Sequence, residues 1–103
     1  VDVVNTTRCY VDISAKPTLH YRGKLLPRYD AVIPRIGPSI TFYGVAILRQ
    51  FESLGTFCVN GSSAIAHSRD RLFTHQLLGR AGVALPTTAF AHSPDDIKGI
   101  IKL

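Results

Sequence analysis

Arg35 is a residue of this sequence that could bind an anion. It follows a short apolar segment, residues 30–33, that ends at Pro34. Ligands of open α/β sheets bind beyond the carboxyl ends of the strands, so a guanidinium at this point would face a bound anion. Gly37 and Ser39 come next, and a helix beginning at Ser39 would offer unpaired N–H groups to the same ligand. The alternative is that Arg35 bonds a carboxylate or backbone carbonyls and only pins the loop.

Few other residues have a type and spacing suited to chemistry. His67 and His75 lie on a helical pattern with no third ligand nearby, and no pair of carboxylates marks a magnesium site. We therefore expect no metal ligand in this chain. Cys9 and Cys58 are isolated thiols without CxxC spacing, which favours reduced, buried cysteines over a disulfide.

The charge balance is basic, with 12 Lys and Arg against 7 Asp and Glu and a net charge of +5. The cations that come close together along the chain are Arg22, Lys24, Arg28 and Arg35. Apart from Tyr21 and Tyr29, no aromatic residues alternate with them, which argues against a binder of single-stranded RNA. A solvated basic face and an acidic peptide partner remain the two interpretations.

The elements that must position these residues alternate between strands and helices. The length of 103 residues suits one domain, 46% of the residues are hydrophobic, and no apolar run approaches the roughly 18 residues of a membrane helix. Residues 6–16 read as a polar connection. We predict strands over residues 1–4, 30–33, 56–59 and 87–91, a β-hairpin over 18–26 centred on Gly23, and helices that begin at Ser39, Ser62 and Ser93.

The strand, helix and strand over residues 30–59 define the fold class. Tyr43, Ile47, Phe51 and Leu54 recur at helical spacing, and Gly55 provides a left-handed stop. A connection of this length favours parallel pairing with a right-handed crossover. A second helical pattern, residues 62–82, is interrupted near residues 68–70. The sequence therefore predicts an α/β fold with a mainly parallel sheet.

Several segments of the chain resemble one enzyme family. They are HYRGKLLP at 20–27, DAVIPRIG at 30–37, ITFYG at 40–44, LRQFE at 48–52, the stretch 60–86, and AHSPDD at 91–96. The family is the RimK-type glutamate ligases, a branch of the ATP-grasp carboxylate–amine ligases. The resemblance implies an incomplete pre-ATP-grasp (Rossmann-like) domain over residues 1–60. It implies a connecting helix and the start of an ATP-grasp domain over residues 61–103.

The same resemblance implies an activity and its partners. The expected reaction adds glutamate to the acidic C-terminus of a small-subunit ribosomal protein through an acyl phosphate, with ATP and magnesium (or manganese). We expect a cytoplasmic protein without a membrane or nucleic-acid partner, and leave a homo-oligomer open. The chain would be an inactive N-terminal piece of the enzyme, with the catalytic residues and magnesium ligands outside it.

The resemblance also assigns roles to particular residues. Arg71 would contact the phosphates of ATP, although the family usually carries lysine there, after Arg-Asp. A guanidinium also binds phosphate, through two hydrogen bonds. The alternative is a solvated first-turn arginine paired with Asp70. Arg35, Gly37 and Ser39 would form the substrate-side loop. Lys102 is not assigned to ATP, because the run from Ser93 to the end of the chain reads as a helix.

Two other functions fit the sequence. One is a non-catalytic basic α/β module that binds RNA or an acidic protein. The other is an ATP-grasp ligase that acts on a small peptide or a cofactor.

Overall fold

The computed structural model describes all residues, 1–103. The chain divides into two compact units, residues 1–69 and 70–103. Both α-helices and β-strands are present, and the fold class is α/β as the sequence predicts. The parallel sheet is small, with two strands, and a separate three-stranded sheet is antiparallel. None of the helices combines the length and the hydropathy that a membrane span requires.

The first unit begins with a three-stranded antiparallel sheet. Its strands are β1 (Cys9–Asp12), β2 (Thr18–Tyr21) and β3 (Lys24–Leu25), in the order β1-β2-β3. Arg22 and Gly23 connect β2 to β3 with φ angles of 50° and 84°. Two consecutive left-handed residues give the tight turn whose twist matches that of the flanking strands. The predicted hairpin is confirmed.

The predicted strand at residues 1–4 is wrong. These residues are in neither a strand nor a helix, and a short 3-10 helix, η1 (Thr6–Arg8), follows them. Asn5 begins η1 by accepting a hydrogen bond of 3.1 Å from the backbone N–H of Thr7. The strand lies instead at Cys9–Asp12, inside the predicted polar connection. The side chains of a strand alternate between its two faces, and Cys9 and Val11 both lie on the core face, where they pair with Tyr21 and Leu19. Residues 1–4 have no partner strand in the chain, so they do not form a strand.

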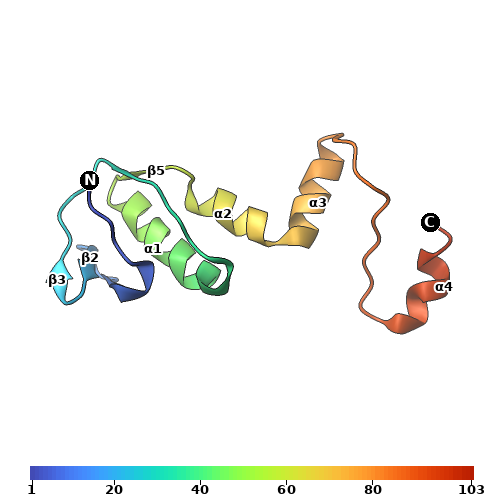
Figure 1. The fold of residues 1–103 in the computed structure, drawn as a ribbon, viewed down its shortest axis with the longest axis horizontal. Helices are drawn as coiled ribbons and strands as arrows, with labels where there is room; N and C mark the ends of the chain where they lie inside the picture. The colour runs from blue at the N-terminus through green and yellow to red at the C-terminus, as the bar shows by residue number, and fades with distance from the viewer. The chain divides into compact units, whose positions relative to one another are not determined.

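The centre of the first unit is a strand, helix and strand, as predicted. Strand β4 (Ala31–Val32) and strand β5 (Phe57–Cys58) pair in parallel, and helix α1 (Thr41–Ser53) connects them. Figure 1 shows α1 lying along the segments that carry these strands. Ile47 and Phe51 are buried in the core, and Gly55 ends the helical segment with a φ of 83°.

Helix α1 begins differently from the prediction. Residues Pro38–Ile40 form a 3-10 turn, η2, and α1 starts at Thr41 without a side-chain cap. Ser39 is therefore inside η2 and does not cap the helix. The Thr41 hydroxyl donates a hydrogen bond of 3.0 Å to the carbonyl of Pro38. Since Pro38 has its φ pre-set for a helical turn, the turn begins at Pro38, ahead of Ser39.

The long second helical pattern is broken where the sequence predicts it. Helix α2 (Ser62–Arg69) ends the first unit, and helix α3 (Arg71–Arg80) begins the second. Asp70 separates them, and its carboxylate accepts a 3.0 Å hydrogen bond from the N–H of Phe73. Gly82 follows the end of α3 with a φ of 74°, a left-handed conformation typical of the residue after a helix.

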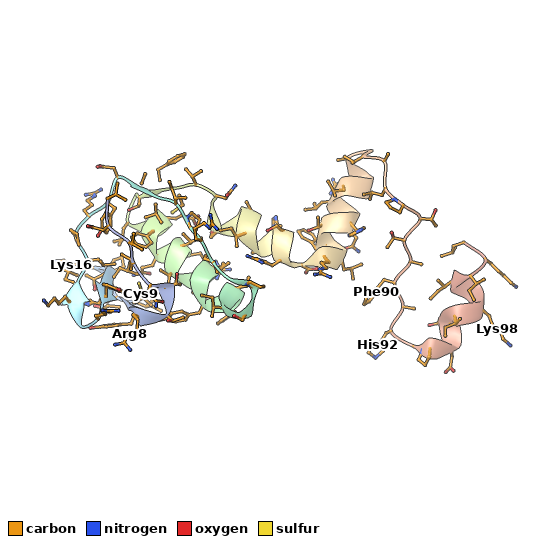
Figure 2. The ribbon with its side chains drawn as sticks, viewed as in Figure 1. Arg8, Cys9, Lys16, Phe90, His92 and Lys98 are labelled. Carbon is orange, nitrogen blue, oxygen red and sulfur yellow. The ribbon has the colours of Figure 1, made fainter.

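The predicted strand at residues 87–91 is also wrong. Residues 83–92 are in neither helix nor strand, and Phe90 and His92 project from an extended segment (Figure 2). The second unit has no other strand, so this segment lacks a partner for its backbone groups. The predicted helix at Ser93 is confirmed, as η3 (Pro94–Asp96) and α4 (Ile97–Ile100), with the Ser93 hydroxyl accepting from the N–H of Asp95 at 3.2 Å.

Phe51→Ala tests the core of the first unit. Phe51 is 8% exposed, so truncation should lower the free energy of unfolding by about 3–5 kcal/mol, through lost burial and the cavity left behind. Urea denaturation of the 103-residue chain measures this. Phe42→Ala is the matched control, since Phe42 lies on the same helix and is 87% exposed. A loss under about 1 kcal/mol for Phe51→Ala would mean that α1 does not bury this face.

Candidate functional site

A pocket opens beyond the carboxyl ends of β4 and β5. Its volume is about 560 Å³, and its walls come from the loop after β4 and from the segment that follows β5 and continues through α2. The lining residues are Pro34, Arg35, Ile36, Gly37, Asn60, Ile65, Ser68 and Arg69. This is the end of a parallel strand pair at which α/β proteins bind ligands.

Arg69 holds one wall of the pocket to the other. Its Nη2 donates a hydrogen bond of 2.6 Å to the backbone carbonyl of Ile36. Ile36 is itself packed against α1 at Gly44, where an added Cβ would lie 2.5 Å from the Ile36 side chain. The loop is therefore held from two sides, by a charge-assisted hydrogen bond and by a contact that only glycine permits.

Arg35 lines the same pocket, but its side chain is exposed and makes neither a hydrogen bond nor an ion pair. The structure pins the loop through Arg69, and the donors of the Arg35 guanidinium are unpaired. Gly37 also lines the pocket, whereas Ser39 lies outside its walls. The binding role of these residues stays a prediction.

Glu52 anchors the helix that carries Arg69. Its two carboxylate oxygens accept hydrogen bonds from the Ser62 N–H at 2.6 Å and the Ser62 hydroxyl at 2.7 Å. Ser62 is buried at the first turn of α2, where a negative charge also interacts favourably with the helix dipole. The pKa of the nearby Cys58 thiol is raised, chiefly by burial and to a smaller extent by the negative charge of Glu52. Sequence reasoning missed Arg69 and Glu52, because both act on residues at a distance along the chain.

Arg71 belongs to the second unit, as the first residue of α3. Its side chain is exposed and has no partner, while its carbonyl lies 2.8 Å from Nδ1 of His75. Asp70 caps the helix rather than pairing with Arg71. Arg71 is thus free to meet a phosphate, and that role remains a prediction.

The chain has two cysteines, Cys9 and Cys58. Both thiols are free, as predicted; Cys9 is buried, which raises its pKa, and Cys58 is half-buried. Nowhere in the chain do three or more His, Cys, Asp or Glu side chains gather in a group that could hold a metal ion.

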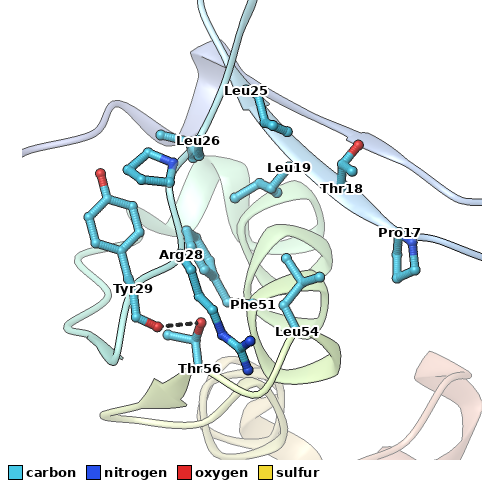
Figure 3. A pocket seen from close by; sticks show the side chains of 11 residues that line it. Pro17, Thr18, Leu19, Leu25, Leu26, Arg28, Tyr29, Phe51, Leu54 and Thr56 are labelled. Carbon is cyan, nitrogen blue, oxygen red and sulfur yellow. Dashed lines mark hydrogen bonds between the residues drawn. The ribbon is translucent and has the colours of Figure 1, made fainter.

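A smaller apolar pocket of about 190 Å³ lies between the hairpin and the C-terminal end of α1 (Figure 3). In Figure 3 the Arg28 guanidinium reaches toward Leu54 and Thr56. A Cβ built on Gly55 would lie 3.5 Å from Arg28 Nη2, so this cation sits at the helix C-terminus, where positive charge is favourable. The Thr56 hydroxyl donates to the Tyr29 carbonyl at 2.9 Å. These contacts are structural, and the pocket brings no nucleophile and base together.

Comparison with known proteins assigns the class. The family model for the RimK pre-ATP-grasp domain matches residues 1–65, so the chain belongs to the RimK pre-ATP-grasp family. A Coxiella burnetii (strain Dugway 5J108-111) protein named "Probable alpha-L-glutamate ligase" is 60% identical over 104 residues, which cover 100% of this chain and 35% of that protein. Proteins of the same name from Shewanella loihica and Vibrio parahaemolyticus are 61% and 59% identical over 103 residues, covering 99% of this chain and 34% of theirs. The chain therefore spans about a third of the length of these curated relatives.

Arg69→Ala tests how the pocket is held. Removing the guanidinium leaves the Ile36 carbonyl without its donor, and we expect a loss of about 1 kcal/mol in the free energy of unfolding. We also expect faster amide hydrogen exchange in residues 35–40, including the N–H of Ile40 that bonds the Gly37 carbonyl. Arg49→Ala is the control, because Arg49 is an exposed arginine of α1 without a hydrogen bond. Unchanged exchange in this loop would show that Arg69 does not hold it.

Proposed function

We propose that this chain forms the pre-ATP-grasp part, and the entry to the ATP-grasp part, of an ATP-dependent ligase that joins glutamate to a carboxylate. The observation that carries the proposal is the pocket holding Arg35 and Arg69 beyond β4 and β5, in a chain of the RimK pre-ATP-grasp family. The names of the relatives add support, because they specify an alpha-L-glutamate ligase.

The proposed reaction has two steps. The acceptor carboxylate attacks the γ-phosphorus of ATP, which gives an acyl phosphate and releases ADP. The amine of glutamate then attacks the acyl carbon and phosphate leaves with the electron pair of the broken C–O bond. The attacking nitrogen loses a proton to water, which completes the amide. Positioning of the reactants and stabilisation of developing charge carry most of the catalysis in phosphoryl transfer. Cations supply the charge stabilisation.

The chain contributes binding and orientation to this reaction. Arg35, free of protein partners, would bind a carboxylate of the acceptor through two parallel N–H donors. Arg69 would keep the loop in place and so fix where that carboxylate lies. Arg71, at the start of α3, would contact the phosphates of ATP. Magnesium or manganese neutralises phosphate charge in such ligases, but this chain has no group of ligands that fits either ion.

We further propose that the acceptor is the acidic C-terminus of a small-subunit ribosomal protein, and that the reaction takes place in the cytoplasm. The Arg35 guanidinium, which has no protein partner, supports an acidic peptide, and the ribosomal identity comes from the resemblance alone. We propose that the boundary between the pre-ATP-grasp domain and the segment leading into the ATP-grasp domain, residues 61–103, falls after residue 60. In packing terms α2 belongs with the first unit.

The role of Arg71 is testable in a chimera in which this chain replaces the matching 104 residues of the Coxiella burnetii relative. Arg71→Ala should weaken binding of a non-hydrolysable ATP analogue by about 10- to 150-fold, the equivalent of one charge-assisted hydrogen bond. Arg71→Lys should retain most of the affinity, because an ammonium also meets phosphate. Calorimetric titration of each variant measures the effect.

Arg80→Ala is the matched control for that titration, since Arg80 is an exposed arginine at the other end of α3. Unchanged affinity in Arg71→Ala, with a chimera that turns over ATP, would remove Arg71 from the nucleotide site. A chimera that neither binds nor turns over ATP, beside an active parent enzyme, would argue against the ligase assignment itself.

The 103-residue chain by itself should show no ATPase or ligase activity, because it contains no ligand set for a metal and only one candidate phosphate contact. Phosphate release and glutamate incorporation are measured against a heat-treated sample. Turnover that co-purifies with the folded chain and disappears on heating would contradict this account of where catalysis resides.

A further inference from the structure

Gly44 has no local reason to be glycine. It is buried inside helix α1, and its backbone is helical, so no left-handed conformation requires glycine there. Glycine in a helix interior loses more conformational freedom on folding than alanine does, and so it weakens the helix. The reason for glycine at this position therefore lies in what Gly44 contacts.

The contact of Gly44 is the side chain of Ile36, in the loop after β4. A Cβ built on Gly44 would lie 2.5 Å from Cγ2 of Ile36 and 2.9 Å from both Cγ1 and Cδ1. Ile36 is only 9% exposed, and it does not belong to the core cluster that contains Ile47 and Phe51. The packing of Ile36 on Gly44, which we call the Ile36 seat, is thus a separate contact between α1 and the loop of the pocket.

The Ile36 side chain alone could not make room for a methyl group at position 44. Cγ1 and Cγ2 are both bonded to Cβ and both face Gly44, so at least one of them faces it in every staggered rotamer. The backbone of Ile36 would therefore have to move away from α1. That backbone accepts the 2.6 Å hydrogen bond from Arg69 and is joined directly to Arg35, so the displacement would reach both arginines of the pocket.

We propose that Gly44 is a positioning residue of the candidate site, because by leaving room for Ile36 against α1 it fixes where the loop presents the Arg35 guanidinium. Gly44 contacts no ligand and acts through Ile36. The value of this position for an acidic peptide rests on the proposed function, whereas the Ile36 seat rests on the packing alone. Positions 36 and 44 share one volume in a close-packed contact, so a side chain can grow at one only if the other shrinks.

Exchanging side-chain volume between the two positions tests the proposal in the 103-residue chain. Gly44→Ala adds a methyl group to the seat, and Gly44→Ala with Ile36→Ala also removes all three Ile36 atoms that this methyl would meet. Gly44→Ala with Ile36→Val is the matched control, because valine keeps both branches at Cβ and with them the clash. Gly79→Ala is a second control, on α3, where the added Cβ would lie 3.9 Å from Leu85 in an ordinary contact.

The first measurement needs no ligand. The N–H of Ile40, which bonds the Gly37 carbonyl in the same loop, should exchange at least about 5-fold faster in Gly44→Ala and in the valine control, because the loop is displaced. Its exchange should return towards the wild-type rate in the alanine double variant, and Gly79→Ala should leave it unchanged. Circular dichroism confirms that each variant is folded.

The second measurement is the affinity for triglutamate, followed by NMR at the amides of residues 60 and 65–69, away from the substituted positions. Gly44→Ala and the valine control should bind about 10-fold more weakly or worse, the equivalent of one charge-assisted hydrogen bond. The alanine double variant should stay within about 3-fold of the wild-type chain, since the two substitutions compensate each other.

Three results would overturn the proposal. They are unchanged exchange of the Ile40 N–H in Gly44→Ala, equal recovery in the alanine and valine double variants, and recovery of exchange without recovery of binding in a chain whose wild type binds triglutamate. The expected pattern of exchange in a chain whose wild type does not bind triglutamate would support the Ile36 seat and contradict the proposed function of the pocket.

Discussion

Helix α1 is the element on which the rest of the first unit depends. Two parallel strands cannot be joined by a tight turn, so β4 and β5 pair only because α1 crosses between them and buries its apolar face. The same helix then holds its surroundings through side chains spaced along its length. Gly44 packs against Ile36 of the loop after β4, and Glu52 caps α2. Tyr43 and Gln50 hold the antiparallel sheet: the Tyr43 hydroxyl donates to the Cys9 carbonyl, and the Gln50 amide donates to the carbonyls of Asp12 and Thr18.

This arrangement divides the charged residues into two groups with different tasks. Glu52 and Arg69 act on the protein itself, one accepting from Ser62 and the other donating to the Ile36 carbonyl. Arg35 has no protein partner and faces the pocket that these two residues shape. A binding cation next to a fixed scaffold is what a ligase needs if it must present an acidic acceptor in one orientation. The proposed role in glutamate ligation rests on this division.

Local patterns predicted the elements whose cause is local. The Arg22–Gly23 turn, the crossover over residues 30–59, the break at Asp70 and the cap at Ser93 all follow from turn residues, spacing and capping chemistry. The strands expected at residues 1–4 and 87–91 fail, because a strand needs a neighbour and apolar composition does not show whether one is present. The hydrogen bond of Arg69 to Ile36, and the tilted ring contact of Tyr10 with His20, join residues that only the folded chain brings together. Sequence spacing could not reveal them.

The central claim is that the pocket at Arg35 and Arg69 binds an acidic peptide. Backbone-amide NMR of the 103-residue chain, titrated with triglutamate and with its uncharged triglutamine counterpart, tests it most directly. The account predicts saturable shifts at residues 35–37, 60 and 65–69 with triglutamate alone, abolished by Arg35→Gln. Shifts confined to residues 8–25, equal shifts with triglutamine, or shifts unaffected by Arg35→Gln would contradict it.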